Sequence, residues 1–255
     1  MVDSANLKIE RAAKHVAELS ELFRKHRPFT FTLERNIQTG EASVGPKKNE
    51  AVIDAAAVII GEAVFNLRSA LDHAYWEIVS PLVSEEERRA IQFPFVGKKK
   101  NRKGGIKQRM AHKVSCGFVR ALYRLRPYHE AGGNELLCLI DKLCNIDKHR
   151  LLIPTGNYHQ ITPAHLREQV PDIPTGAVHI SSVNAKRTLT WNFPPPNRAM
   201  RRKYARAPII EKELNVPVDI IISVGTGGDP RPVVPTLNQL VDVARTTVEI
   251  LRASV

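Results

Sequence analysis

The chain has few cysteines, few aromatic residues and no long apolar run. Its three cysteines form no CxxC pair, and an odd number of thiols argues against a disulfide framework. The longest apolar stretch, residues 52–65, is interrupted by Asp54, Gly61 and Glu62, so it is too short and too polar to span a bilayer. The first residues are charged and form no apolar leader segment. We therefore expect a cytoplasmic protein with reduced thiols that does not enter a membrane.

Acidic residues are missing from two stretches that are rich in lysine and arginine. Residues 98–126 hold eleven basic side chains and no acid, and residues 198–206 hold five more, within a formal net charge of +12. Concentrated positive charge attracts polyanions, nucleic acid more often than anionic lipid. A solvated segment that only aids solubility is the alternative. The candidate nucleic-acid-binding residues are Lys98, Lys99, Lys100, Arg102, Lys103, Lys107 and Arg109.

Helical periodicity dominates the first 150 residues. Apolar residues recur at helical spacing over residues 5–26, 50–80, 106–125 and 134–149. Residues 29–34 alternate as a strand does, and the glycines at 40 and 45 predict a hairpin after them. The basic segment 97–109 has the composition of a loop.

Prolines and strand-like segments dominate the rest of the chain. Residues 178–183 and 187–193 predict a hairpin, residues 218–224 a buried strand, and residues 236–252 a final helix. This order favours an α+β fold. We expect a mainly helical core over 1–150, with a short N-terminal hairpin, and a β-rich region with a terminal helix over 151–255 packed on the same core. The early strand is expected to join the later strands in one sheet.

The 50–80 helix carries an arginine and a histidine with four residues between them. The segment is Asn66-Leu67-Arg68-Ser69-Ala70-Leu71-Asp72-His73. An arginine holds a phosphate through two hydrogen bonds, and a histidine transfers protons near neutral pH. At about 100° per residue the two side chains lie about 140° apart, both off the apolar stripe. The alternative is structural, an ion pair between Arg68 and Asp72 at i,i+4 spacing.

A second polar cluster closes the 134–149 helix. Its candidate residues are Asn145, Asp147, His149 and Arg150. Basic side chains at that position also complement the negative end of a helix, which is the structural alternative. A metal shared by His73 and His149 is a further alternative, but the chain has no HExxH motif and no cysteine cluster. We expect no metal and no cofactor.

The motif from Arg68 to His73 resembles the Rx4–6H signature of HEPN domains. The wider pattern, NLRSALDH followed by NIDKHRLL and a β-rich region, resembles a family of actinobacterial and phage-associated proteins over nearly the whole chain. The HEPN resemblance implies a helical bundle that forms a homodimer and cleaves RNA without a metal. A toxin or antiphage role with an antitoxin partner follows by analogy. Arg68 would then bind the scissile phosphate and His73 would transfer a proton, oriented by Asn66 and Asp72.

Two functions therefore remain open. The first is metal-independent RNA cleavage by the Arg68/His73 site, with His149 or Arg150 completing the pocket. The second is non-catalytic nucleic-acid binding through the basic stretch 98–126. Cleavage depends on His73, whereas binding depends on salt and on residues 98–103.

Overall fold

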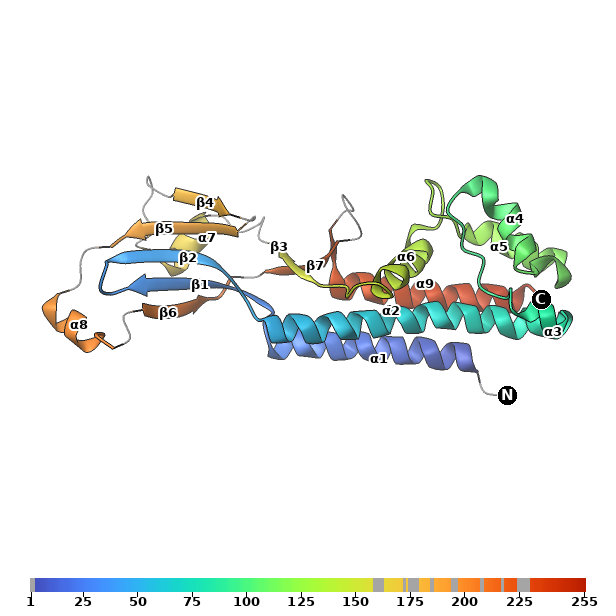
Figure 1. The fold of residues 1–255 in the computed structure, drawn as a ribbon, viewed down its shortest axis with the longest axis horizontal. Coiled ribbons are helices and arrows are strands. Elements are labelled where there is room, and N and C mark those ends of the chain that lie inside the picture. Colours follow the sequence, from blue (N-terminus) through green and yellow to red (C-terminus); the bar gives the residue numbers. More distant parts are fainter. Residues whose placement is uncertain are drawn as a thin grey trace. The chain divides into compact units, whose positions relative to one another are not determined.

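The chain divides into two compact units, each assembled from separate segments (Figure 1). The computed structural model describes residues 3–157, 163–171, 173, 179–183, 186–193, 197–206, 209–216, 218–223 and 230–255. Unit 1 consists of Met1–Arg24, Asp54–Pro154 and Ile222–Val255, and unit 2 of Lys25–Ile53 and Thr155–Ile221. The two units interrupt each other along the sequence, so neither is one continuous segment.

Unit 1 is helical. Its long helices are α1 (Ser4–Lys25), α2 (Glu50–Val79), α6 (Glu135–Asp147) and α9 (Val233–Ala253). Shorter helices follow α2 in the chain, namely α3 (Glu85–Arg88), α4 (Arg102–Gln108) and α5 (Cys116–Leu125). Single 3-10 turns cover Ser80–Leu82, Lys99–Asn101 and Ala111–Lys113, and the short strand β8 (Arg231–Pro232) precedes α9.

The apolar spacing of α2 becomes its buried face. Ile60, Leu67 and Leu71 are fully buried, because residues three and four apart lie on the same side of a helix. Helix α9 packs against α5 and α6. Its Arg252 donates hydrogen bonds of 2.7 and 2.8 Å to Asp3 just before α1, and this bonding lowers the pKa of Asp3 to about 2. The first and last helices of unit 1 are therefore joined by an ion pair.

Unit 2 is built on a five-stranded antiparallel sheet. Its strands are β1 (Phe29–Asn36), β2 (Glu41–Lys48), β4 (His179–Val183), β5 (Lys186–Asn192) and β6 (Ile209–Leu214), in the order β4-β5-β2-β1-β6. The turn between β1 and β2 contains Gly40 at φ 80°, a left-handed conformation that glycine adopts without strain. A separate pair is formed by β3 (Thr155–Asn157) and β7 (Asp219–Ile222).

The core of unit 2 lies between the sheet and a short helix. Phe31, Val44 and Trp191 from the strands pack with Leu166 of α7 (Pro163–Gln169) and with Val170 just after it. A further helix, α8 (Arg198–Lys203), follows β5 in the chain and is capped by the Asn197 side chain, which accepts from the Met200 amide. In β5 the buried Leu189 and Trp191 alternate with exposed residues, as one covered face requires, whereas β1 buries its residues 31–33 in succession.

The α+β class is confirmed, and so is the pairing of the early hairpin with later strands. Strand β1 pairs with β6 along six positions, from Phe31 with Leu214 to Asn36 with Ile209. The division into units nevertheless differs from a single boundary at residue 150, because the hairpin 29–48 groups with the later strands and α9 groups with the helices.

Three local predictions were wrong. The basic segment 97–109 is not a loop, since it contains a 3-10 turn and helix α4, anchored by the buried Ile106. The predicted helix over 106–125 is interrupted before α5, where Met110 takes a left-handed φ of 64°. Strand β7 is buried only at Ile222 rather than along its length. The predicted turn at 184–185, the prolines 194–196 and the glycine-rich segment 225–228 lie outside the described residues.

Candidate functional site

Arg68 lies on α2 at the edge of the buried face, between the fully buried Leu67 and Leu71 stripe and solvent. Only 13% of its side chain is exposed. Its Nη1 donates to Asp72 Oδ1 at 2.5 Å and its Nε donates to Asp141 Oδ1 at 3.2 Å. The guanidinium carbon lies 4.8 Å from the centroid of the Phe95 ring. The Arg68 guanidinium, which the HEPN resemblance assigns to phosphate binding, is therefore held by two carboxylates and an aromatic ring.

Asp141 is the centre of this arrangement. It sits on α6 with 14% of its side chain exposed. Besides Arg68, it receives hydrogen bonds from His129 Nε2 at 3.0 Å and from Asn145 Nδ2 at 3.3 Å. Burial raises the pKa of Asp141, but the His129 hydrogen bond and the Arg68 charge outweigh burial, so its pKa lies below the ordinary value. Asp141 is thus ionised at neutral pH. We call Arg68, Asp72, His129, Asp141 and Asn145 the Arg68 network.

Asp72 links the network to the chain that follows α2. Its Oδ1 accepts from the Phe93 backbone amide at 2.8 Å as well as from Arg68. Phe93 is buried and makes an edge contact with the ring of Tyr75 on α2. Asp72 therefore anchors an extended segment, which is a structural role. The i,i+4 pair of Arg68 and Asp72 that the sequence offers as an alternative is present.

His73 and Asn66 do not join Arg68. His73 is partly exposed and makes no hydrogen bond or ion pair with any residue in the described part of the chain. Asn66 is 8% exposed. Its Nδ2 donates to the Glu62 carbonyl at 2.8 Å, and its Oδ1 accepts from Lys8 Nζ of α1 at 3.3 Å. Asn66 therefore takes part in the packing of α1 on α2.

The four residues of the second predicted cluster, at 145–150, do not lie together in one site. Asn145 reaches Asp141 and so joins the Arg68 network. His149 and Arg150 are exposed beyond the end of α6, and their backbone amides donate to the Ile146 carbonyl. Asp147 packs on α2 instead, where an added Cβ at Gly61 would lie 2.5 Å from its Oδ1. Burial raises the pKa of Asp147.

The sequence analysis did not identify His129, the histidine that bonds to Asp141 in the Arg68 network. His129 lies in the loop between α5 and α6, far from Arg68 in the chain. No spacing rule connects them, because the contact depends on how α6 packs on α2. The available signals were Asp141 in the middle of an apolar helix and the turn residues Pro127, Gly132 and Gly133 around His129.

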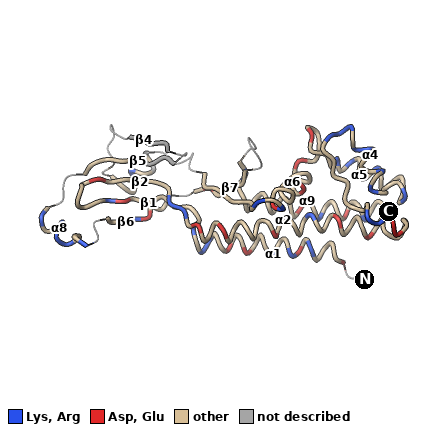
Figure 2. The backbone as a smooth tube through the Cα atoms, in the orientation of Figure 1, with Lys and Arg blue, Asp and Glu red and all other residues tan. Residues whose placement is uncertain are grey.

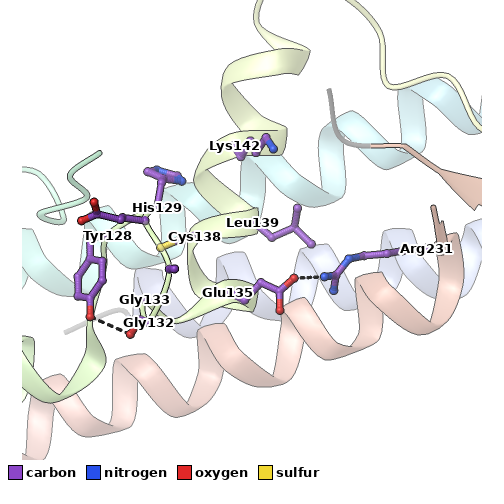
Figure 3. A pocket seen from close by; sticks show the side chains of 11 residues that line it. Tyr128, His129, Gly132, Gly133, Glu135, Cys138, Leu139, Lys142 and Arg231 are labelled. Carbon is purple, nitrogen blue, oxygen red and sulfur yellow. Dashed lines mark hydrogen bonds and ion pairs between the residues drawn. The ribbon is translucent and has the colours of Figure 1, made fainter. Parts of the chain in front are cut away.

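A pocket of about 370 Å³ opens beside His129 (Figure 3). Its wall includes Cys138, whose pKa is raised to about 12 by burial, so this thiol remains protonated. An ion pair between Arg231 and Glu135 lies at its edge. The residues that line it are Tyr128, His129, Glu130, Ala131, Gly132, Gly133, Glu135, Cys138, Leu139, Lys142 and Arg231. Such a volume is within the range of small-molecule sites.

The basic segment forms a second, more open hollow of about 650 Å³. Basic residues gather along this part of the chain, and again on α8 (Figure 2). Tyr123 of α5 and Glu130 also line the hollow. Five exposed lysines surround or flank it, and we call them the lysine surface: Lys98, Lys99, Lys100, Lys103 and Lys107.

The two predicted arginines of this segment have structural partners. Arg102 donates to the Tyr123 carbonyl at 3.2 Å, and its guanidinium carbon lies 4.3 Å from the Tyr123 ring centroid. Arg109 donates to the Ala90 carbonyl at 2.9 Å, and its own carbonyl accepts from Tyr75 Oη at 2.8 Å. The seven predicted binding residues therefore divide into five exposed lysines and two arginines that tie elements together.

Other site classes find little support among the described residues. Within that part of the chain, no group of three or more His, Cys, Asp or Glu side chains is arranged to hold a metal ion. No helix there has both the length and the apolar character needed to cross a membrane. All three cysteines are free thiols. Comparison of the chain with protein-family models, with curated proteins and with solved structures gives no match.

Proposed function

We propose that this protein binds RNA through the lysine surface. The observation that carries the proposal is that four of these five exposed lysines line one hollow, while the fifth, Lys107, is exposed on the same helix as Lys103. None of them forms an ion pair or a side-chain hydrogen bond with another residue in the described ranges. Neutralising backbone phosphates releases counterions, and this release drives sequence-independent binding. Lysines that have no acidic partner within the protein are available to bind these phosphates.

Tyr123 adds a second element of recognition. Its ring lines the hollow, and Arg102 lies against it. An aromatic ring beside lysines suits a single strand, because unpaired bases stack on aromatic rings while lysines follow the phosphates. A duplex offers no free base faces. The proposed partner is therefore single-stranded RNA, or an RNA with unpaired segments.

Salt-dependent binding tests this proposal. We expect Lys98→Gln/Lys99→Gln/Lys100→Gln to weaken binding of a fluorescent single-stranded RNA on the order of tenfold and to lower the salt slope by about 2. The matched control is Arg11→Gln/Lys14→Gln/Lys148→Gln, which removes the same charge from exposed positions elsewhere. Equal losses in both triple variants would show that net charge, rather than the lysine surface, attracts RNA.

Metal-independent RNA cleavage by an HEPN-like Arg68/His73 site is the second candidate. The observation in its favour is that His73 is partly exposed and has no hydrogen-bonding partner among the described residues. Arg68 must exchange at least one of its two carboxylates for a phosphate to take part. Cleavage of total RNA in EDTA by wild type and not by His73→Ala supports this candidate. RNA retained in a gel shift without cleavage leaves the binding function alone.

A further inference from the structure

His129 is held rigidly at the mouth of the pocket. Its backbone amide donates to the Val96 carbonyl at 3.1 Å, and Val96 in turn donates to the Pro127 carbonyl at 3.0 Å. Tyr128 Oη closes the other side of the loop by donating to the Gly132 carbonyl at 2.8 Å. The His129 side chain is 30% exposed. A fixed and accessible imidazole is the arrangement that proton transfer requires.

The hydrogen bond to Asp141 selects the tautomer of His129. An ionised carboxylate has no proton to give, so His129 Nε2 must donate across the 3.0 Å contact. In the neutral ring, Nδ1 then carries the lone pair. Within the described residues, Nδ1 has no hydrogen-bonding partner. The carboxylate also stabilises the doubly protonated ring that forms after proton uptake. Arg68 and Asn145 hold Asp141 in place from other directions.

The pocket and the lysine surface are neighbours. Glu130, next to His129 in the chain, lines both the pocket and the lysine hollow, and its Oε2 accepts from the Lys99 backbone amide at 3.0 Å. Lys142 of α6 contributes a further cation to the pocket (Figure 3). An RNA strand that lies along the lysine surface therefore passes the pocket, which is large enough for a ribose with its phosphate.

We infer that His129, oriented by Asp141, is an acid–base catalytic residue that cleaves RNA seated in this pocket. The inference rests on the proposed RNA binding. His129 Nδ1 takes the proton from a ribose 2′-hydroxyl. The 2′-oxygen then forms a bond to the adjacent phosphorus, while the bond from phosphorus to the 5′-oxygen breaks. The leaving 5′-oxygen takes a proton from water, and the hydroxide that remains receives the proton held by His129, which restores the neutral ring. The products are a 2′,3′-cyclic phosphate and a 5′-hydroxyl, and no oxidant or reductant is consumed.

The roles of the neighbours follow from their contacts. Asp141 and Arg68 are positioning residues, because they act through His129 and not on the RNA. Lys142 supplies positive charge near the phosphate, where negative charge develops in the transition state. His73 has no part in this reaction.

The test measures cleavage and binding side by side in EDTA. A labelled single-stranded RNA reports cleavage, and the same sequence made of 2′-deoxynucleotides reports binding alone. The variants are His129→Ala, Asp141→Asn and His73→Ala, with His112→Ala as a matched control because His112 is an exposed histidine of the same unit. Circular dichroism and the thermal midpoint show whether each variant is folded.

We expect His129→Ala to bind normally and to lose on the order of 10²–10⁴-fold in cleavage rate. Added imidazole should restore part of that rate, which a purely structural role for His129 would not allow. Asp141→Asn should keep its affinity for RNA while its pH–rate profile changes, and the control His112→Ala should cut like wild type. Mass spectrometry should find the cyclic phosphate end.

Two results overturn the inference without touching the binding proposal. One is a wild-type protein that binds RNA and leaves it intact. The other is a folded His129→Ala protein that cuts at the wild-type rate, and a simultaneous loss in His73→Ala would assign the reaction to the Arg68/His73 site. A wild-type protein that binds neither substrate overturns the proposed function itself.

Discussion

Three arginines of unit 1 and the lysines of the lysine surface differ in their contacts. Arg68, Arg102 and Arg109 each contact a carboxylate or a backbone carbonyl of another element. The lysine surface has no such contacts within the described ranges. A guanidinium offers several donors in a fixed plane and is weakly hydrated, so it suits partly buried positions, whereas an ammonium is strongly hydrated and stays in water. Charge in a sequence therefore predicts electrostatic potential, but not which cations are available to a ligand.

Removing Arg68, which joins α2 to α6, is expected to have the largest effect on stability. We expect Arg68→Ala to lower the free energy of unfolding by about 3 kcal/mol, because Asp141 and Asp72 lose the cation that compensates their burial. Urea denaturation measures the change. Arg124→Ala is the control, since Arg124 is exposed on α5. Equal stability of the two variants would contradict the structural role of Arg68.

Acid should act on the same contact. The pKa of Asp141 is lower in the folded protein than its ordinary value of 3.8. Its stabilising contribution is therefore complete above the unfolded pKa and is lost as the pH falls through the folded pKa. We expect the free energy of unfolding of wild type to decrease below about pH 4, with a smaller decrease in Asp141→Asn. Parallel pH profiles for the two proteins would contradict the assignment.

Arg102 and Lys103 are adjacent in the chain but differ in exposure and contacts. Arg102→Ala should cost about 1–2 kcal/mol of stability, because it removes the hydrogen bond to the Tyr123 carbonyl and the contact with the Tyr123 ring. Lys103→Ala should leave stability unchanged and weaken RNA binding. Thermal denaturation and a binding titration on both variants separate the two effects. Loss of stability in Lys103→Ala would show that Lys103, like Arg102, has a structural role.

The smallest expected effect comes from a lysine that does have an acid partner. Lys113 Nζ lies 2.7 Å from both carboxylate oxygens of Glu87, and this hydrogen bond lowers the pKa of Glu87. We expect Lys113→Ala to change stability little, because exposed ion pairs contribute little, and to leave the affinity for RNA unchanged. Weaker RNA binding by Lys113→Ala would show that Lys113 contacts RNA despite its ion pair with Glu87.

Features that depend on local periodicity were predictable, and features that depend on packing were not. Helices α1 and α2 follow from apolar spacing, and α6 begins where the predicted 134–149 helix does, because the Asn134 side chain accepts from the Leu137 amide. Helix α4 was missed because its glycines and lysines have loop composition, while one buried residue, Ile106, anchors it. Strand β6 was missed because its residues are mostly exposed, so it lacks an apolar pattern.

The candidate site shows the same limit. Arg68 and Asp72 were named correctly as neighbours, because an i,i+4 relation is fixed by the helix itself. His73 shares their helix but not their surroundings. The contact of Arg68 with Asp141, and of Asp141 with His129, joins three chain segments whose packing no spacing rule describes.

The interrupted chain path of unit 1 has a consequence for protein synthesis. Asp3 and Arg252 belong to the same unit and are joined directly, so α1 emerges from the ribosome long before its partner in α9 exists. At about 5–20 residues per second the delay is on the order of ten to forty seconds. In the later part of that interval, after α5 and α6 have been synthesised, the apolar faces that α9 covers on them remain open to solvent. Nascent chains of this protein are therefore expected to depend on chaperones until translation has passed residue 253.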